Sequence, residues 1–560
     1  MADTVREIER KYEADSTTRL PDLAGIDRVA TVVEQGVEDL DALYYDTPDQ
    51  RLTAAGITLR RRTGGRDAGW HLKLPAGPGE REEIRAPLSD VPPPELTSLV
   101  RARVLDRDLV PVVRLRTRRT VRELRDAAGA PLAEVAVDEV WAWPAGEAEK
   151  PGAAGVAGRT EARWREIEVE LTGGGERDPG LLDEAERALA AAGVHPAAAP
   201  SKLARALEET GLRPARPEDR TAAVASGKGG AATRRKNFGE KESGEKEAGK
   251  KGSGRKGSGK KGAGRRGTAG DLVLEYVREQ LRVIVELDPA VRRDVPDSVH
   301  RMRVATRRLR SAFRSYTKVL DRGVTAPVGG ELKWLAAELG VERDREVLTD
   351  RLVSAVADVP RTLRLGPVDA RLRIWSERHR AASRDRVLAA LDGDRYLALL
   401  KTLHALLEDP PLRPGAGRPA PEIAARAVLK DYRRLARRVR TALDAPAGQD
   451  RDVALHRARK AAKRTRYAAE AARPALGRPA KKFAKHVKRV QQLLGDHQDS
   501  VVARGALREL ATQAQQAGEG GFTFGLLYGR EEARAADRER ELPRVWKKAS
   551  RRKYRAALRP

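Results

Sequence analysis

The stretch Glu7-Ile8-Glu9-Arg10-Lys11, near the start of the chain, decides how the N-terminal part of this protein is interpreted. Side chains alternate between the two faces of a β-strand, so Glu7, Glu9 and Lys11 would share one face at intervals of about 7 Å. Such a row is costly inside an apolar core, because each buried charge needs a partner. It suits a water-filled cavity that holds a divalent cation and a polyanion together, whereas a solvent-exposed edge strand is the simpler alternative.

The bulk composition narrows the classes of protein to consider. The 560 residues suggest two to four domains, and 40% hydrophobic residues are enough for real cores. The chain has no cysteine, so any metal site must use Asp, Glu or His. The net charge of +28 attracts polyanions such as nucleic acid, anionic membranes or polyphosphate. We find no signal-peptide pattern and no apolar run of about 18 residues, and we therefore expect a cytoplasmic protein without a membrane partner.

Most of the strands predicted after the opening stretch have one charged face. The residues that share such faces are Arg60 with Arg62, His71 with Lys73, Arg114 with Arg116 and Arg118, Glu134 with Asp138, and Glu166 with Glu168 and Glu170. A sheet that is apolar outside, where helices cover it, and charged inside is a closed barrel with a polar lumen. The alternative is an ordinary half-buried sheet with solvated charges, which leaves few residues to form a core.

Seven motifs in this region together resemble one known family. They are Glu-x-Glu-x-Lys at 7–11, Tyr-Tyr-Asp-Thr-Pro at 44–48, Leu-Arg-Arg-Arg at 59–62, His-Leu-Lys-Leu-Pro at 71–75, Glu-Val-Ala-Val-Asp at 134–138, Glu-Ile-Glu-Val-Glu-Leu at 166–171 and Ser-Lys-Leu-Ala-Arg-Ala at 201–206. Their order resembles that of the CYTH family, the triphosphate tunnel metalloenzymes. The resemblance implies that residues 1–212 form an eight-stranded antiparallel β-barrel tunnel that hydrolyses or cyclises triphosphates with Mg²⁺ or Mn²⁺.

The resemblance also implies roles for individual residues. The metal ligands would be Glu7, Glu9, Asp138, Glu166, Glu168 and Glu170. The triphosphate would be bound by Lys11, Arg60, Arg62, Lys73, Arg116, Arg118, Lys202 and Arg205. Catalysis would fall to Glu9, Glu168 and Lys11, with one of the two carboxylates orienting the attacking water. The register of the arginine row at 114–118 stays open by one pair, and His71 departs from the small polar residue of many relatives.

These residue types suit phosphoryl transfer, which depends mostly on positioning and electrostatic stabilisation. Arginine makes bidentate contacts to phosphate, and lysine supplies a compact charge. No serine or cysteine nucleophile with a neighbouring base stands out, so the sequence favours direct attack by water.

Residues 213–269 lose all apolar periodicity. The run from Lys251 to Gly267 consists almost entirely of Gly, Ser, Lys and Arg. Such a segment buries too little area to offset its ordering entropy, and we expect a disordered basic linker. It would act as a spacer between two domains, or as a weak polyanion-binding arm.

The C-terminal part, residues 270–560, has helical periodicity and an internal repeat. Val299 to Arg310 resembles Leu455 to Arg466, with His300 and His456 at matching places. Leu339-Gly340 and Leu494-Gly495 repeat at nearly the same separation. The sequence therefore predicts an all-α, duplicated helical bundle with repeats at about 271–420 and 421–560.

Each repeat places a basic face on one helix. The first contains His300, Arg303, Arg307 and Arg310, and the second contains His456, Arg459, Lys463 and Arg466. Like charges at these spacings destabilise an isolated helix by a few tenths of a kcal/mol per pair, roughly. Their occurrence at two matching places indicates a bound polyanion, whereas a solvated face on an arginine-rich protein is the simpler interpretation of either helix alone.

This half resembles the CHAD family, the conserved-histidine α-helical domain. The resemblance rests on the two histidine helices and on the two Leu-Gly-x-x-x-Asp segments. It implies polyphosphate binding on the basic faces and marks His497 as a further family histidine. A metal role for His300 and His456 is weaker, because the surrounding arginines would repel a cation.

The sequence thus predicts a multidomain α+β protein that hydrolyses inorganic triphosphate or short polyphosphate with a metal ion, while its helical domain binds polyphosphate. One alternative is a non-catalytic polyphosphate-binding scaffold, and another is an adenylate cyclase or thiamine triphosphatase on the same fold. Nucleic-acid binding ranks lower, because we see no aromatic stacking platform.

Overall fold

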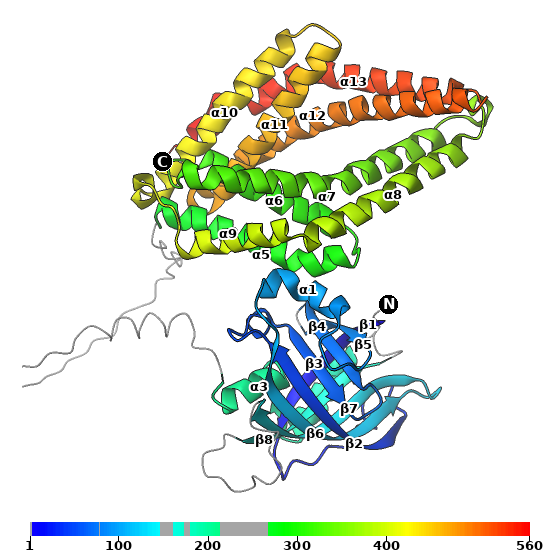
Figure 1. Cartoon of the computed structure of the whole chain (residues 1–560), viewed down its shortest axis with the longest axis vertical. Coiled ribbons are helices and arrows are strands. Elements are labelled where there is room, and N and C mark those ends of the chain that lie inside the picture. Colours follow the sequence, from blue (N-terminus) through cyan, green and yellow to red (C-terminus); the bar gives the residue numbers. More distant parts are fainter. Residues whose placement is uncertain (1–2, 78, 146–160, 173–179, 213–266, 560) are drawn as a thin grey trace, which may run out of the picture. The chain divides into compact units, whose positions relative to one another are not determined.

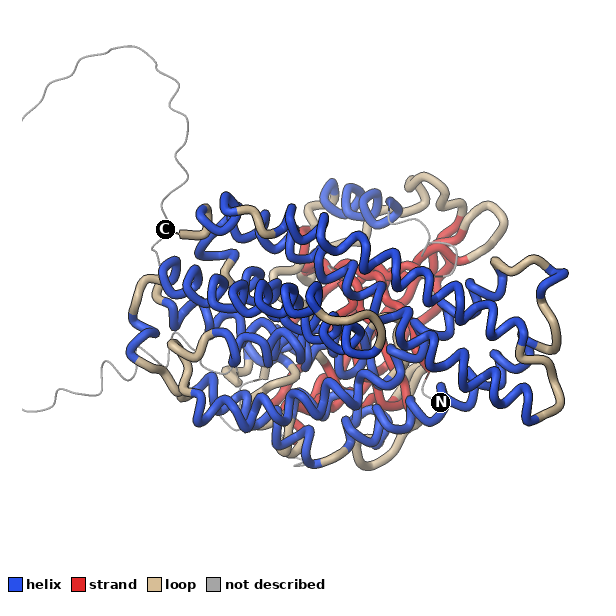
Figure 2. The backbone as a smooth tube through the Cα atoms, turned by 90° about the horizontal axis from the view of Figure 1, so that it is seen from above, coloured by secondary structure: helices blue, strands red, loops and turns tan. Residues whose placement is uncertain are grey.

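The computed structural model describes residues 3–77, 79–145, 161–172, 180–212 and 267–559, and the statements below refer to these residues (Figure 1). The chain divides into two compact units, residues 1–262 and 263–560, which are described separately. Within the described residues, all strands belong to the first unit and long helices build the second (Figure 2). The predicted linker lies outside the described residues up to position 266, and the first helix of the second unit begins at Ala269.

The first unit is a closed antiparallel β-barrel. Its strands are β1 (Asp3–Ala14), β2 (Thr31–Asp46), β3 (Thr58–Thr63), β4 (Gly69–Gly77), β5 (Glu80–Ala86), β6 (Val110–Arg125), β7 (Pro131–Pro144) and β8 (Ala162–Leu171). Neighbours pair in the order β5-β4-β3-β2-β6-β7-β8-β1. Strand β1 closes the ring, because its residues 3–8 pair with β5 and its residues 9–14 pair with β8. The predicted eight-stranded antiparallel barrel is confirmed.

Apolar side chains cover the outside of the barrel. Helix α1 (Pro94–Val104) packs Leu96 and Val100 on Trp70, Leu72 and Ile84 of β4 and β5. Helix α2 (Gly180–Ala191) covers the outer face of β1, β7 and β8 in the same way. Because apolar positions alternate with charged ones along these strands, the charged residues face the interior.

One end of the barrel is filled by helix α3 (Lys202–Glu209). The Ser201 hydroxyl caps this helix by accepting a hydrogen bond of 3.1 Å from the Ala204 amide. Its Leu203 and Leu207 pack on inward-facing apolar residues, among them Leu115 of β6. The cap and the apolar face together fix the first residue of α3, Lys202, at the edge of the charged interior. The two-residue strand β9 (His195–Pro196) adds to β1 just before α3.

The second unit consists of two helical repeats, one helix between them and one short helix after them. The first repeat holds α5 (Ala269–Arg292), α6 (Ser298–Ser315), α7 (Arg322–Ala357) and α8 (Val368–Asp392). After α9 (Asp394–Glu408) and the 3-10 turn η4 (Pro414–Gly417), the second repeat holds α10 (Ala420–Asp444), α11 (Gln449–Ala471), α12 (Arg473–Gln516) and α13 (Phe522–Ala549), followed by α14 (Arg552–Ala556). The predicted duplicated bundle is confirmed.

Successive helices of each repeat run back and forth, and the long α12 and α13 lie side by side (Figure 1). Buried side chains, mostly alanine, valine and leucine, from the segment between α10 and the C-terminal end of α14 form one hydrophobic core. A second hydrophobic core lies where the end of α7, the start of α8, the end of α12 and the start of α13 meet. The matching helices α6 and α11 contact one another, which brings the two predicted basic helices together. None of the described helices is long and apolar enough to cross a membrane.

Candidate functional sites

The interior of the barrel contains a cavity of about 380 Å³ with charged walls of both signs. The predicted site residues that line it are Glu7, Glu9, Lys11, Arg60, Arg62, Lys73, Glu168, Glu170 and Lys202. They meet because each holds an inward position on its strand, or the first position of α3. We call this space the barrel cavity.

The tightest group of charges in the barrel surrounds the Lys202 ammonium. Its Nζ lies 2.8 Å from Asp138, 2.7 Å from Glu166 and 2.6 Å from Glu168. Ligand atoms of the three carboxylates all lie within 4.8 Å of one another. Burial would lower the pKa of Lys202, but the three carboxylates raise it well above its usual value. The ammonium is therefore firmly charged, and these acids are held together by it.

Two more cations hold the same acids. The Arg119 guanidinium donates to Asp138 at 2.7 and 2.8 Å and to Glu168 at 2.5 Å, and Lys11 bonds both Glu168 and Glu9. Burial favours the protonated acids, but the cations prevail and hold the pKa of Asp138 and of Glu168 below its usual value. Both acids are ionised at neutral pH.

A second group of acids, Glu7, Glu9 and Glu170, lies along β1 and β8. Lys73 donates to Glu7 at 2.7 Å, while the other oxygen of Glu7, Oε2, is buried without a hydrogen-bond partner among the described residues. Burial raises the pKa of Glu7, and burial together with the charge of Glu7 raises the pKa of Glu170 to about 7. This end of the cavity has an excess of negative charge.

The donor chemistry of these acids fits a hard divalent cation. All the candidate ligand atoms are carboxylate oxygens, which Mg²⁺ and Mn²⁺ prefer. The orphaned oxygen of Glu7 and the crowding around Glu170 are both relieved by added positive charge. Glu7, Glu9 and Glu170, with Asp138, Glu166 and Glu168 beside them, are the residues that could hold such an ion.

The opposite wall, from β3 to β5, is built around Glu83. This buried carboxylate accepts a hydrogen bond of 2.9 Å from His71 and lies within 3.7 Å of Arg60 and 3.6 Å of Lys73. Burial and the nearby Arg60 lower the pKa of His71 to about 4, despite the hydrogen bond to Glu83, so the imidazole is neutral. Burial and the neighbouring arginines lower the pKa of Arg62 to about 9. The wall therefore gathers Arg60, Arg62 and Lys73 near Glu83, with Arg62 also paired to Asp67 and Lys73 to Glu7.

In the helical unit, α6, α7, α10 and α11 enclose two adjoining cavities of about 450 and 380 Å³. They share a wall formed by Arg310, Arg314, Arg434 and Arg464, and we call them together the basic groove. Other cations that line it are Arg307, Arg322, Lys430, Arg438, Arg457, Lys460 and Lys463. No carboxylate lines either cavity in the described part of the chain. The groove therefore offers one sign of charge only.

The family models match both units. A CYTH domain model matches residues 5–194, and a CHAD domain model matches residues 275–508. The chain belongs to the family that joins a CYTH domain to a CHAD domain. The "Uncharacterized protein Rv2226" of Mycobacterium tuberculosis is 39% identical over 541 residues, which cover 96% of this chain and 94% of that protein.

Solved structures also resemble this chain in part. PptA from Streptomyces chartreusis aligns at 19% identity over 50% of this chain and 99% of its own, with a TM-score of 0.43. The CHAD domain from the plant Ricinus communis aligns at 26% identity over 51% of this chain and 92% of its own, with a TM-score of 0.41.

Three predicted triphosphate contacts of the CYTH domain need correction. Arg116 is exposed, reaches Asp41 at 3.3 Å and lies over Trp143 on the outside of the barrel, and Arg118 is exposed as well. The inward positions of β6 are the odd-numbered ones, so the arginine row at 114–118 faces outward and Arg119 enters the cavity instead. Arg205 stacks on Trp164 and pairs with Glu209, because the neighbouring leucines of α3 occupy the face toward the barrel.

Sequence reasoning also missed other cavity residues of the CYTH domain, among them Glu83 and Tyr44. Glu83 precedes the outward-facing Ile84 in an alternating run and pairs across the sheet with Lys73. That alternation was available in the sequence, but Glu83 has no acidic partner two residues away to make a row. The Tyr44 hydroxyl accepts from Arg60 at 3.5 Å, a contact that only the folded barrel reveals.

Apart from His497, the predicted polyphosphate residues of the CHAD domain divide into three sets. Arg307, Arg310 and Lys463 line the basic groove. His300 and Arg303 lie a turn or more before Arg307 on α6, and His456 and Arg459 stand next to Arg457 and Lys460 on α11, but none of the four is among the residues that line the groove. Arg466 is a correction, because it pairs with Glu470 at 3.4 Å and packs over Tyr467.

The repeated glycines have a packing role beside these helices. A Cβ at Gly340 would lie 2.9 Å from the Arg303 guanidinium, and one at Gly495 would lie 3.5 Å from that of Arg459. Each arginine therefore crosses the next helix at its glycine. This contact explains why the Leu-Gly segments recur with the histidine helices.

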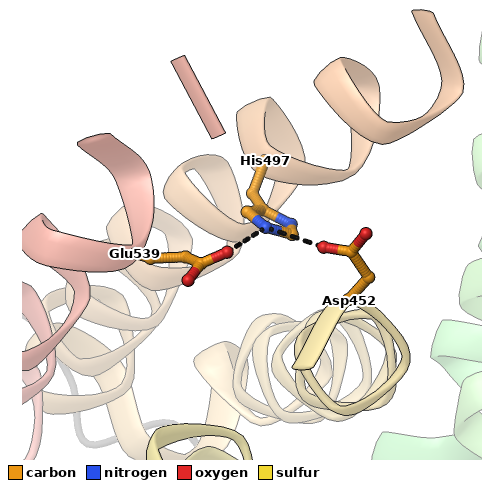
Figure 3. Close-up of side chains that lie close together, drawn as sticks. All are labelled: Asp452, His497 and Glu539. Atoms are coloured by element: carbon orange, nitrogen blue, oxygen red, sulfur yellow. Dashed lines mark hydrogen bonds and ion pairs between the residues drawn. The ribbon is translucent and has the colours of Figure 1, made fainter. Parts of the chain in front are cut away.

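His497 is the remaining correction. Its ring is buried, and Nε2 lies 3.1 Å from Glu539 and 3.4 Å from Asp452 (Figure 3). The three residues come from three different helices. Arg451 reaches Glu539 at 3.1 Å, and Arg504 donates to Asp452 at 2.8 Å, so both carboxylates already have cationic partners. His497 is thus a buried structural link between α11, α12 and α13, away from the basic groove.

Proposed function

We propose that the CYTH domain hydrolyses inorganic triphosphate or short polyphosphate with Mg²⁺ or Mn²⁺. The observation that carries this proposal is the barrel cavity, where carboxylates on β1, β7 and β8 face a cationic wall on β3 and β4. A divalent ion needs the first group, and a chain of phosphates needs the second. An enclosed cavity that holds both suits phosphoryl transfer, in which positioning and charge stabilisation supply most of the rate.

In this proposal, Arg60, Arg62 and Lys73 hold the phosphate oxygens. The bound metal ion would neutralise the charge that develops on the transferred phosphoryl group. A water oxygen bonds to the terminal phosphorus as the bridging P–O bond breaks, and diphosphate leaves. Glu9 is the better candidate to orient this water, because Glu168 already binds three cations whereas Glu9 binds only Lys11 among the described residues.

The CHAD domain would bind the polyphosphate chain in the basic groove. The described lining of the groove holds many cations and no carboxylate, which suits the binding of phosphate oxygens. Since both domains belong to one chain, a polyphosphate bound by the groove would be present at raised effective concentration near the barrel.

A substrate panel tests this function. Phosphate release is measured from tripolyphosphate, ATP, thiamine triphosphate and long-chain polyphosphate, each with Mg²⁺, with Mn²⁺ and with EDTA. We expect tripolyphosphate to be the best substrate and EDTA to abolish release. Preference for thiamine triphosphate would identify a thiamine triphosphatase, and conversion of ATP to a cyclic nucleotide would identify an adenylate cyclase, both on the same fold. Tight binding without turnover of any compound would identify a scaffold.

A further inference from the structure

A third cavity of the helical unit differs from the basic groove in its chemistry. It measures about 980 Å³ and lies among the end of α6, η4, α10 and α14. We call it the α14 pocket. It is within the size range, about 300–1,000 Å³, of cavities that bind organic ligands.

One side of the α14 pocket is apolar. Tyr316, Ile423, Ala427 and Tyr432 are nearly buried core side chains that reach its surface, and Leu429 and Pro414 extend the apolar area. The basic groove is lined instead almost wholly by arginine and lysine. An inorganic polyanion gains nothing from apolar walls, whereas an organic group does.

The rest of the α14 pocket is cationic. Its charged lining residues are Lys318, Arg413, Arg418, Arg426, Lys430, Arg433, Arg555 and Arg559. Arg418 and Arg426 share Glu422, at 2.8 and 2.7 Å. Among the described residues, no ion pair is recorded for Lys318, Arg413 or Arg433 and no carboxylate lines the pocket. An anionic ligand would therefore meet uncompensated charge.

The α14 pocket and the basic groove adjoin one another. Thr317 and Lys430 line both, and Arg434 follows Lys430 one helical turn along α10 on the groove side. A ligand whose organic part occupies the apolar side could thus extend a chain of phosphates past Lys430 toward Arg434. Planar arginine side chains at the rim, such as Arg413 and Arg433, suit an aromatic ring as well as a phosphate.

We infer that the α14 pocket binds the organic end of a nucleoside polyphosphate, whose phosphates lie along Lys430 and Arg434. The apolar wall and the arginine rim suit a nucleoside, and the adjoining groove suits its chain of phosphates. This site lies in the helical unit and does not depend on catalysis in the barrel.

The test compares ATP with tripolyphosphate, which has the same phosphates without the nucleoside. Binding to the full chain is measured by calorimetry in EDTA, which prevents turnover. In the variant Arg413→Ala/Arg433→Ala we expect ATP to bind at least fivefold more weakly and tripolyphosphate to change less than twofold. The control Arg437→Ala/Arg440→Ala removes the same charge from positions of α10 outside the pocket lining, and we expect it to bind ATP as the wild type does.

A photolabel locates the site independently of affinity. Irradiation with 8-azido-ATP, followed by peptide mapping, should label the segments 413–433 or 555–559. Label confined to peptides of the barrel would overturn the inference. So would equal loss of ATP and tripolyphosphate binding in the pocket variant, since the apolar wall would then contribute nothing.

Discussion

The barrel cavity and the basic groove both gather cations, but they compensate them differently. In the barrel, Lys202, Arg119 and Lys11 are buried among carboxylates at hydrogen-bond distance. In the groove, the arginines of α6, α10 and α11 face one another, and no carboxylate lines the described walls. Paired, buried charges hold a fixed geometry, whereas a cavity wall that carries cations and no carboxylate attracts an anion. The first arrangement suits chemistry on a small substrate, and the second suits capture of a long anion.

The largest effect is expected from the acids of β1. The variant Glu7→Gln/Glu9→Gln should reduce metal-dependent release of phosphate from tripolyphosphate by at least about 100-fold, because losing metal ligands should cost at least as much as losing their outer partners, typically 10–100-fold. The measurement is initial rate against Mg²⁺ and Mn²⁺ concentration. Glu34→Gln is the control, since its side chain is 73% exposed and pairs with Arg122 outside the cavity. Activity near wild type in the double variant would exclude these acids from the site.

Lys202 tests how strongly the barrel depends on its paired charges. The substitution Lys202→Met leaves Asp138, Glu166 and Glu168 facing one another and should lower the free energy of unfolding by about 3–5 kcal/mol. On the same helix, Arg205→Met breaks a partly exposed pair with Glu209 and should cost less than about 1 kcal/mol. Urea denaturation followed by near-ultraviolet circular dichroism compares the two. Equal losses would mean that the ammonium contributes no more than a surface charge.

His71 gives the barrel a pH dependence. Its pKa of about 4 in the folded protein lies below its ordinary 6.5, so the unfolded chain takes up a proton first as the pH falls. Stability is therefore lost on acidification, by about 2 kcal/mol between pH 6.5 and 5. The raised pKa of Glu170 acts in the opposite direction, but it is common to wild type and variant. Urea midpoints at pH 7, 6 and 5 should fall less for His71→Gln than for wild type, and parallel curves would refute the assignment.

The smallest effect is expected in the basic groove, where many cations share the ligand. Arg434→Ala/Arg438→Ala should weaken binding of long-chain polyphosphate by roughly tenfold at low salt and reduce the slope of log K against log salt by about 2. Arg437→Ala/Arg440→Ala removes the same charge from positions of α10 that do not line the groove. Calorimetry at several salt concentrations makes the comparison. The same loss in both pairs would mean that net charge, not the groove, binds the chain.

The sequence predicted the barrel because charged and outward-facing residues alternate along its strands. Glu7, Glu9 and Lys11 alternate with outward-facing residues, and the same alternation recurs in β3, β4 and β8. In β6 this alternation does not identify the inward face. The arginine row at 114–118 occupies the even positions and Arg119 an odd one, so a cationic side chain is found in both phases. Only the pairing of β6 with β2 and β7 decides which phase faces inward.

In the helical unit the sequence predicted the repeat, but it did not predict which residues line the basic groove. Lys430, Arg434 and Arg438 lie on the lined face of α10, yet Arg433, Arg437 and Arg440 stand among them in the sequence. So many cations on one helix leave its inward face undefined until the helices pack. His497 misled for another reason: its two carboxylate partners, Asp452 and Glu539, lie far from it in the sequence and come from other helices.

The divided pairing of β1 has a consequence for synthesis on the ribosome. Residues 3–8 await β5, but residues 9–14 find their partner only in β8, whose Glu170 pairs with Glu9. Until residue 171 has left the exit channel, the nascent chain presents an open strand edge, the kind of surface on which chains aggregate. The acids of β1 that line the barrel cavity are therefore translated among the first residues of their domain, but they gain their β8 partners only when residues 162–171 have been made, an interval in which a chaperone would be of most use.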